Sequence, residues 1–237
     1  MSLTAREKSG IEIEPIPAGV YVATCYGLID LGTHLNPTFG NEAHKVLVQW
    51  EVPEVRGEFE RDGQRVNLPR AISKRYTLSL SEKANLRKDL ESWRGRLFAA
   101  QELAGFDLRV LLGTACQLQI VHETSKEGKT YATIAAIMAL PKGMPKPKLE
   151  NPPVFFSFEE AGPKPVLKPD LPEWVRKIIM ESREWREATG TPAPAPAAGP
   201  KAAPAPATAA KTCPAPTPTP APAPADGPPI EEDDVPF

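Results

Sequence analysis

Hydrophobic residues in the first 140 positions follow two spacings, and the change between them separates strands from a helix. Five segments have the alternating or β-branched composition of strands: 19–31, 44–52, 71–80, 116–123 and 130–140. In the second segment Trp50 lies on the same face as three valines, so we expect it to pack in the core rather than to stack on a ligand. The first segment is long enough to bend, and Gly27 is a suitable position for a β-bulge.

Between the third and fourth strands the spacing becomes helical. Leu86, Leu90, Trp93 and Leu97 recur at intervals of four, three and four residues, which predicts one apolar stripe on a helix over 82–98. Ser81 is the expected N-cap of this helix.

The segment after the fifth strand has its own apolar positions. Residues 154–158, VFFSF, form a short patch that we expect to pack on the strands. A second amphipathic helix is predicted over 171–187, with Pro172 near its start and Trp174 and Trp185 on its apolar face.

The resulting order is three strands, one helix and two strands. This is the order of the OB-fold, a small five-stranded Greek-key barrel with its helix between strands three and four. Other small α+β domains share the order. We therefore predict a mainly β chain with an OB-fold nucleic-acid-binding domain over 1–150 and a barrel-docking extension over 151–187.

Composition sets the C-terminal part of the chain apart. Of the 29 prolines among 237 residues, 14 lie in the 42 residues from 188 to 229, together with 15 alanines. Such a segment cannot bury enough apolar surface to offset its ordering entropy, so we predict a disordered linker there. It leads to an acidic tip over 230–237.

Charge is segregated along the chain although the total is only −2. Residues 1–150 carry a net charge of +2, and residues 151–237 carry −4. We expect neither a membrane-spanning helix nor a signal peptide, because long apolar runs are missing. Three cysteines without CxxC spacing argue against a disulfide framework or a zinc site and fit a reducing cytoplasm.

Motifs of catalysis are missing from the sequence. The three histidines form no metal-binding pattern, and neither a phosphate-binding glycine loop nor a nucleophile elbow occurs. Cys25 and Cys116 are expected to be small core residues. We therefore expect a non-enzymatic protein that uses no cofactor and no metal.

Candidate binding residues gather where an OB barrel holds single strands, on strands two and three and the bordering loops. Cations there would follow phosphates, and aromatic rings would stack bases. The candidates are Phe39, Lys45, Arg70, Lys74, Arg75, Tyr76, Lys126, Lys129 and Tyr131. Each also has a structural interpretation. The cations can be ordinary solvated charges, and Tyr76 alternates with Lys74 and Leu78 on a mixed face that fits core packing equally well.

The last seven residues, EEDDVPF, resemble the acidic tip of bacterial single-stranded DNA-binding proteins. Asp233, Asp234, Pro236 and Phe237 match the family's pattern, and Val235 stands where the family usually has isoleucine. The segment 72–95, ISKRYTLSLSEKANLRKDLESWRG, looks like OB-type proteins of phages and prophages. The linker and the second helix depart from the bacterial pattern, so the bacterial oligomer interface is not transferred.

The resemblance implies a phage-type single-stranded DNA-binding protein in the cytoplasm of a bacterial host, associated with the nucleoid. It would coat single-stranded DNA, alone or as a homo-oligomer, and its tip would recruit replication, recombination and repair enzymes. The alternative is an interaction adaptor, or an accessory protein of a nuclease or recombinase, that binds no DNA. Convergence of Lys74, Arg75, Lys126 and Lys129 with Phe39 or Tyr76 in one groove favours DNA binding, and their dispersal around the body favours the adaptor.

Overall fold

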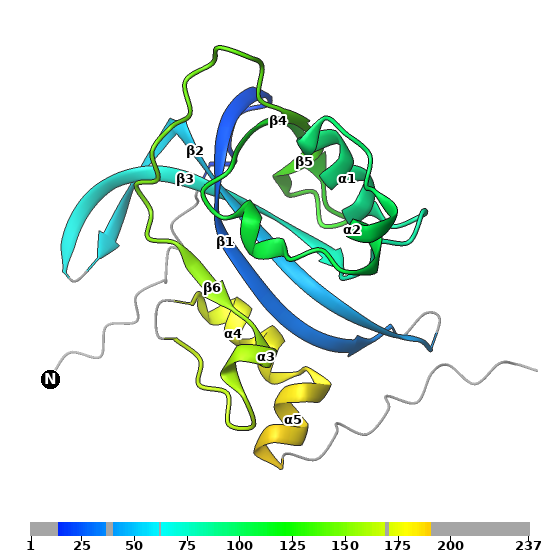
Figure 1. The fold of residues 1–237 in the computed structure, drawn as a ribbon. Helices are drawn as coiled ribbons and strands as arrows, with labels where there is room; N and C mark the ends of the chain where they lie inside the picture. The colour runs from blue at the N-terminus through cyan, green and yellow to red at the C-terminus, as the bar shows by residue number, and fades with distance from the viewer. Residues whose placement is uncertain (1–13, 37–39, 62, 169–170, 191–237) are drawn as a thin grey trace, which may run out of the picture. The chain divides into compact units, whose positions relative to one another are not determined.

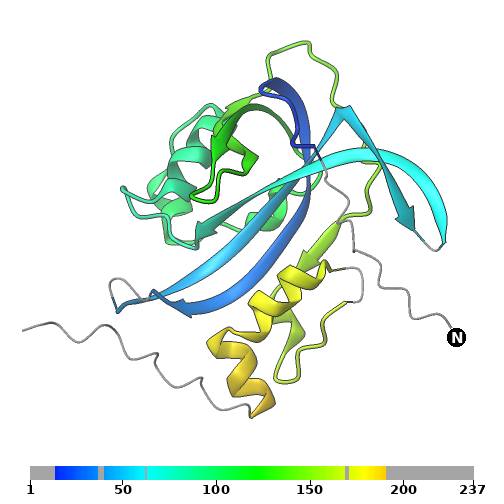
Figure 2. The same cartoon turned by 180° about the vertical axis from the view of Figure 1, so that it is seen from behind.

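The computed structural model describes residues 14–36, 40–61, 63–168 and 171–190 (Figures 1 and 2). Its strands are β1 Gly19–Leu35, β2 Glu42–Arg61, β3 Gln64–Thr77, β4 Ala115–Thr124, β5 Thr130–Ala139 and β6 Val154–Phe156. Its helices are α1 Asn85–Arg94, α2 Ala100–Ala104, the 3-10 helix η1 Leu108–Leu111, α3 Phe158–Ala161, α4 Glu173–Met180 and α5 Arg183–Thr189. The prediction of a mainly β chain is confirmed.

Five strands form one antiparallel sheet in the order β3-β2-β1-β4-β5. Within the described part of the chain no ladder joins β3 to β5, so the sheet is open rather than a closed barrel. The predicted bulge site, Gly27, lies at a register shift in β1. A Cβ atom there would come within 2.5 Å of the Gln49 amide oxygen, which explains the glycine.

The strands are longer than the sequence pattern suggests, most of all β2 and β3. Their hairpin continues past Val52, where the described residues of both strands are exposed or half-buried except for the buried Pro69. In Figures 1 and 2 this half of the hairpin projects away from the helices. Val55, Val66 and Leu68 are half-buried and alternate with exposed polar residues, but Pro53, Gly57 and Pro69 interrupt the pattern that marks a strand in the sequence.

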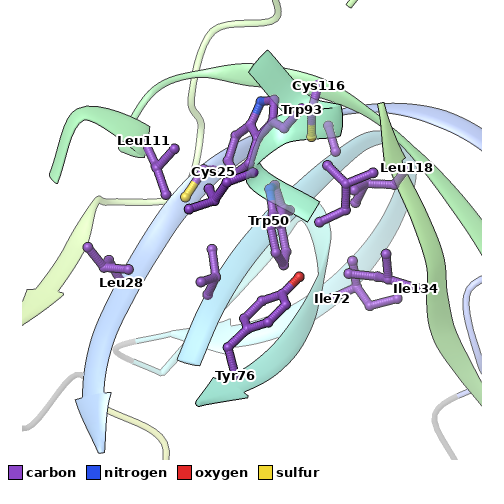
Figure 3. Packing of buried hydrophobic residues seen from close by; sticks show 14 of the residues in the cluster. Cys25, Leu28, Trp50, Ile72, Tyr76, Trp93, Leu111, Cys116, Leu118 and Ile134 are labelled. Carbon is purple, nitrogen blue, oxygen red and sulfur yellow. The ribbon is translucent and has the colours of Figure 1, made fainter. Parts of the chain in front are cut away.

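The main hydrophobic core lies between the sheet and α1 (Figure 3). Trp50 is fully buried, and its ring centroid lies 5.7 Å from that of Trp93 on α1. Leu86 and Leu90 complete the buried stripe of the helix. The expectation that Trp50 and Trp93 are core residues is therefore confirmed.

A second core covers the opposite face of β1 and β2. Ile29, Leu31 and Leu47 pack there against the C-terminal segment. Strand β6 pairs in parallel with β1, and Phe156 from β6 is buried in this cluster with Val175 and Ile179 of α4. Alternate side chains of β1 thus serve two cores, one on each face of the sheet.

A buried carboxylate fixes the connection that leads into β6. Glu51 of β2 is completely buried. Its Oε1 accepts a hydrogen bond of 3.0 Å from the Glu150 amide, and its Oε2 accepts bonds of 2.9 and 2.8 Å from the backbone and side-chain nitrogens of Asn151. The second core and this carboxylate together hold the C-terminal segment on β1 and β2.

Both predicted helices are shorter than their patterns. The first begins after Ala84, not Ser81, and ends at Gly95, which adopts a left-handed conformation that stops the helix. The second is divided into α4 and α5. Ser182 separates them because its hydroxyl oxygen accepts a hydrogen bond from the Trp185 amide and caps α5.

The predicted linker, 188–229, and the tip, 230–237, lie outside the described residues except for the end of α5 and Gly190. Among the residues that are described, no helix is both long enough and apolar enough to cross a bilayer.

Candidate nucleic-acid interface

A cavity of about 500 Å³ lies where β2 begins, β3 ends and the connection to α1 passes. We call it the basic pocket. Its lining residues are Lys45, Lys74, Arg75, Tyr76, Thr77, Ser79, Ser81, Lys83, Ala84 and Asn85. Four of them are cations and none is an acid, so the pocket presents a local positive field that the net charge of −2 conceals.

The register of β2 and β3 brings the cations together. Lys45 pairs with Thr77, and Arg75 lies opposite Leu47, two residues along the ladder. The Lys45 ammonium donates a 2.6 Å hydrogen bond to the Thr77 hydroxyl. Lys83 comes from the connection to α1 and lies only eight positions after Arg75 in the sequence. Four of the predicted site residues thus line one pocket, namely the cations Lys45, Lys74 and Arg75 together with Tyr76.

Lys74 also has a structural task. Its ammonium donates to Asp89 on α1 at 2.8 Å, and the Tyr76 hydroxyl donates to the same carboxylate oxygen at 2.8 Å. The Lys74 nitrogen lies 5.5 Å from the centroid of the Tyr76 ring. This cluster joins the end of β3 to α1 and partly neutralises Lys74.

Tyr76 corrects the sequence-based choice of stacking residues. Its side chain belongs to the main core and is only 4% exposed, so the ring has no free face for a base. Burial, and then the adjacent Asp89 carboxylate, raise the pKa of its hydroxyl. The alternation with Lys74 and Leu78 hid this role, because a partly buried lysine with an ion-pair partner can share a core face.

The other predicted residues do not line the basic pocket. Lys126 and Lys129 are exposed on the β4–β5 connection, and Arg70 is half-buried on β3. Tyr131 is 45% exposed and donates a 2.9 Å hydrogen bond to Glu123, whose carboxylate raises the pKa of the tyrosine. Phe39 and the tip residues Asp233, Asp234, Val235, Pro236 and Phe237 lie outside the described residues.

Sequence reasoning missed Lys83 and its neighbours Ser81 and Asn85. Lys83 belongs to the polar segment before α1 and looks like any solvated charge. The only signal was its proximity in sequence to the Lys74–Arg75 pair at the end of a strand.

A second cavity, of about 570 Å³, has the opposite charge. We call it the acidic pocket. Its apolar walls come from Leu28, Val46, Leu78, Phe106, Leu108, Phe155 and Phe156, and its charged residues are Asp30, Asp107, Arg109, Glu159 and Glu160. Four carboxylates against one guanidinium exclude this cavity as a place for a phosphate chain.

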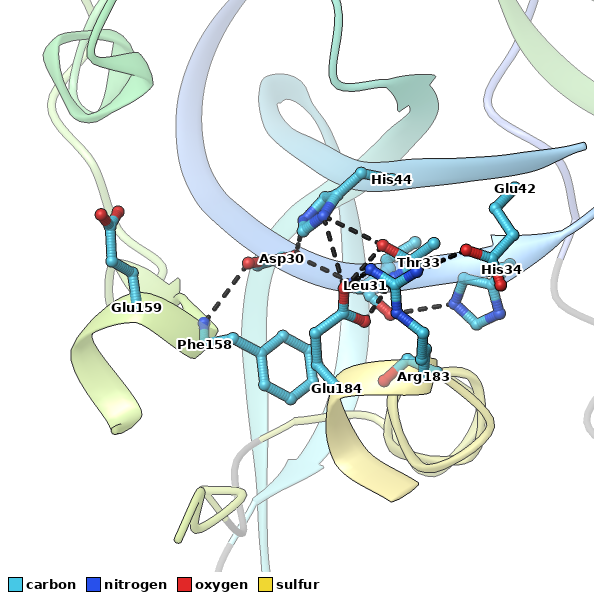
Figure 4. A network of polar contacts seen from close by, with 12 residues as sticks. Asp30, Leu31, Thr33, His34, Glu42, His44, Phe158, Glu159, Arg183 and Glu184 are labelled. Atoms are coloured by element: carbon cyan, nitrogen blue, oxygen red, sulfur yellow. Dashed lines mark hydrogen bonds and ion pairs between the residues drawn. The ribbon is translucent and has the colours of Figure 1, made fainter. Parts of the chain in front are cut away.

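A polar network ties β1 and β2 to the C-terminal segment (Figure 4). His44 Nε2 lies 2.6 Å from Asp30 Oδ1, and Asp30 Oδ2 accepts a 3.3 Å bond from the Phe158 amide. On the other side, the Thr33 hydroxyl and amide donate to the two oxygens of Glu184 at 2.6 and 2.7 Å. The network therefore reaches both α3 and α5.

Protonation within this network follows from its contacts. The hydrogen bond to Asp30 raises the pKa of His44 above its usual value. Burial alone would raise the pKa of Glu184, but the hydrogen bonds from Thr33 lower it. These contacts favour the protonated form of His44.

Among the described residues, no three histidine, cysteine, aspartate or glutamate side chains are placed to hold a metal ion. Cys25 and Cys116 are buried and unpaired, and burial raises the pKa of both thiols, that of Cys25 to about 12.

No known protein family matches the chain, and no curated protein is similar to it. The function proposed below therefore rests on the residues and pockets of this chain.

Proposed function

We propose that the protein binds single-stranded DNA without catalysis and that the basic pocket is the centre of its binding surface. The observation that supports this most is the convergence of Lys45, Lys74, Arg75 and Lys83 on one cavity with no acid in its lining. Cations in such an arrangement follow a phosphate backbone whatever its sequence.

The size of the pocket supports a single strand over a duplex. A volume of about 500 Å³ lies within the range of small-ligand sites and suits an unpaired nucleotide. Among the described residues that line the pocket, none has an exposed aromatic ring, so phosphate contacts supply most of the affinity there. Strong salt dependence and little base preference follow.

The strand order supports the finer fold proposal. The sheet β3-β2-β1-β4-β5, with α1 between β3 and β4 in the chain, supports our proposal of a partly open OB-fold barrel. Ile72 of β3 and Ile134 of β5 share the main core, so the two ends of the sheet approach each other (Figure 3).

The acidic tip supplies the second half of the proposal. Residues 233–237 resemble the partner-binding end of bacterial single-stranded DNA-binding proteins, so we propose that they recruit replication, recombination or repair enzymes. Deleting 235–237 is expected to leave oligo-dT affinity unchanged or higher while abolishing capture of such enzymes. Capture that survives the deletion contradicts the role of the tip.

Fluorescence anisotropy with labelled oligo-dT and a labelled duplex tests DNA binding by the full chain. If all four cations contact phosphates, log affinity falls with log salt with a slope of up to about −2.8, from roughly 0.7 per phosphate. Arg75→Glu should weaken binding about ten-fold or more. Arg65→Glu is the matched control, because Arg65 lies on the same strand, is 85% exposed and does not line the pocket.

Two results would contradict the proposal. Absent or salt-independent binding of oligo-dT removes the function and favours the adaptor, whose binding would depend on protein partners alone. Equal losses in the Arg75→Glu and Arg65→Glu variants remove the basic pocket as the site.

A further inference from the structure

The four cations of the basic pocket differ in how much of their charge is available. Lys45 is hydrogen-bonded to Thr77, and Lys74 is ion-paired with Asp89. Arg75 and Lys83 are exposed, and no hydrogen bond or ion pair engages either of them within the described residues. Two cations thus face the cavity with no internal partner to neutralise them.

Donors on the backbone border the same cavity. Ala84 and Asn85, where α1 begins, are part of the lining. Ala84 has no side chain that could cap the helix, and the first turn contains no acid. The first helical hydrogen bond runs from the Lys88 amide to the Ala84 carbonyl at 3.2 Å. The amides of residues 85–87 therefore have no carbonyl acceptor within the helix. They add to the positive field of the four cations.

The chemistry of this cavity selects one class of ligand. Unpaired cations of two kinds and free amide donors, with no acid in the lining, suit a compact multivalent anion with several acceptor oxygens. The volume accommodates the nucleotide that carries such a group, not only the group itself.

We propose that the basic pocket binds the phosphate group of a nucleotide, with Arg75 and Lys83 as its ion-pair partners and the first-turn amides of α1 as hydrogen-bond donors. The identification of this phosphate as part of a DNA strand rests on the function proposed above. The phosphate site thereby anchors the strand at one fixed point of the sheet.

Nuclear magnetic resonance of the ¹⁵N-labelled full chain tests the site directly. Sodium phosphate, deoxythymidine 5′-monophosphate and oligo-dT are added separately at an ionic strength held constant with sodium chloride. We expect saturable shifts of the amides of residues 85–87 with all three. The free-phosphate arm and the oligonucleotide arm distinguish the two sources of the anion. Shifts that are spread over the surface, or that are absent from these amides in every arm, would overturn the proposal.

Lys83→Ala tests the role of an unpaired cation, and Lys88→Ala is its matched control. Both lysines are exposed and five positions apart, but Lys88 does not line the pocket. Lys83→Ala should weaken phosphate binding about five-fold and reduce the salt slope for oligo-dT by roughly 0.7, the value for one phosphate. The control should change neither. Equal effects of the two variants would overturn the proposal.

Ala84→Asp separates loss of the site from loss of folding. A carboxylate at the N-cap accepts the free amides and stabilises the helix, so the melting temperature should rise by about 2–4 °C. The same carboxylate occupies the donors and repels a phosphate, so phosphate binding should be abolished. Undiminished phosphate binding in this more stable variant would show that the first turn of α1 takes no part.

Failure of this inference and failure of the proposed function give different results. Oligo-dT binding that depends on salt but not on Lys83 or Ala84 removes the phosphate site and leaves DNA binding in place. Phosphate binding without oligo-dT binding removes DNA as the source of the phosphate and, with it, the proposed function.

Discussion

Glu51 offers a sharp test of what holds the C-terminal segment on the sheet. Its carboxylate is fully buried and accepts three hydrogen bonds from residues 150 and 151, almost 100 positions away. Replacing it by alanine removes all three. At the lower end of the usual range, a hydrogen bond to a charged acceptor contributes about 1.5 kcal/mol, and three sum to about 4–5 kcal/mol.

Water reduces this loss. Glu150 is exposed and Asn151 is half-buried, so solvent can satisfy some of the freed donors. We therefore expect Glu51→Ala to lower the free energy of unfolding by about 3 kcal/mol, which corresponds to about 6–12 °C in melting temperature for a domain of this size. Glu51→Gln keeps one acceptor oxygen and should lose roughly half as much.

Chemical denaturation followed by tryptophan fluorescence measures these differences, and hydrogen exchange reports on the amides of residues 150 and 151. Glu58→Ala is the matched control, because Glu58 lies on the same strand with its side chain 71% exposed. It should change stability by no more than about 0.5 kcal/mol. If Glu51→Ala were as mild as Glu58→Ala, the buried carboxylate would not be the anchor inferred here.

Two further predictions concern protonation. Because contact with Asp30 raises the pKa of His44, the charged imidazole stabilises the folded chain below its unfolded-state pKa of about 6.5. That contribution is lost as the pH rises from there through the higher folded-state pKa, and urea titrations of the wild type and His44→Gln should converge across this window. Burial raises the pKa of Cys25 and Cys116, so a thiol reagent at pH 8 should leave both unmodified in the native chain and label them only in denaturant, as mass spectrometry of the labelled peptides would show.

The sequence predicted the parts of the fold that depend on local pattern. Alternation in β2 placed Trp50 in the core, and the helical stripe did the same for Trp93. Gly27 was recognisable because a strand of that length needs a bend. The absence of a β3–β5 ladder in the described structure was not predictable. The order of elements along the chain does not show whether the first and last strands of a sheet pair to close it.

The candidate site was predicted only in part. Strand positions were enough to predict three cations of the basic pocket, Lys45, Lys74 and Arg75. Lys83 was not predictable, because it lies on a connection whose path depends on where α1 begins. The interior role of Tyr76 depends on Asp89, which lies on another element. Pairings of this kind leave no periodic signal in a sequence.

Residues that are adjacent in the sequence line the two different pockets. Val46 and Leu78 line the acidic pocket, and their neighbours Lys45 and Thr77 line the basic one. Carboxylates act over about 8–10 Å at ordinary salt concentrations. Under the proposed function, the carboxylates of the acidic pocket would disfavour the continuation of a phosphate chain from Lys45 toward Val46 and Leu78.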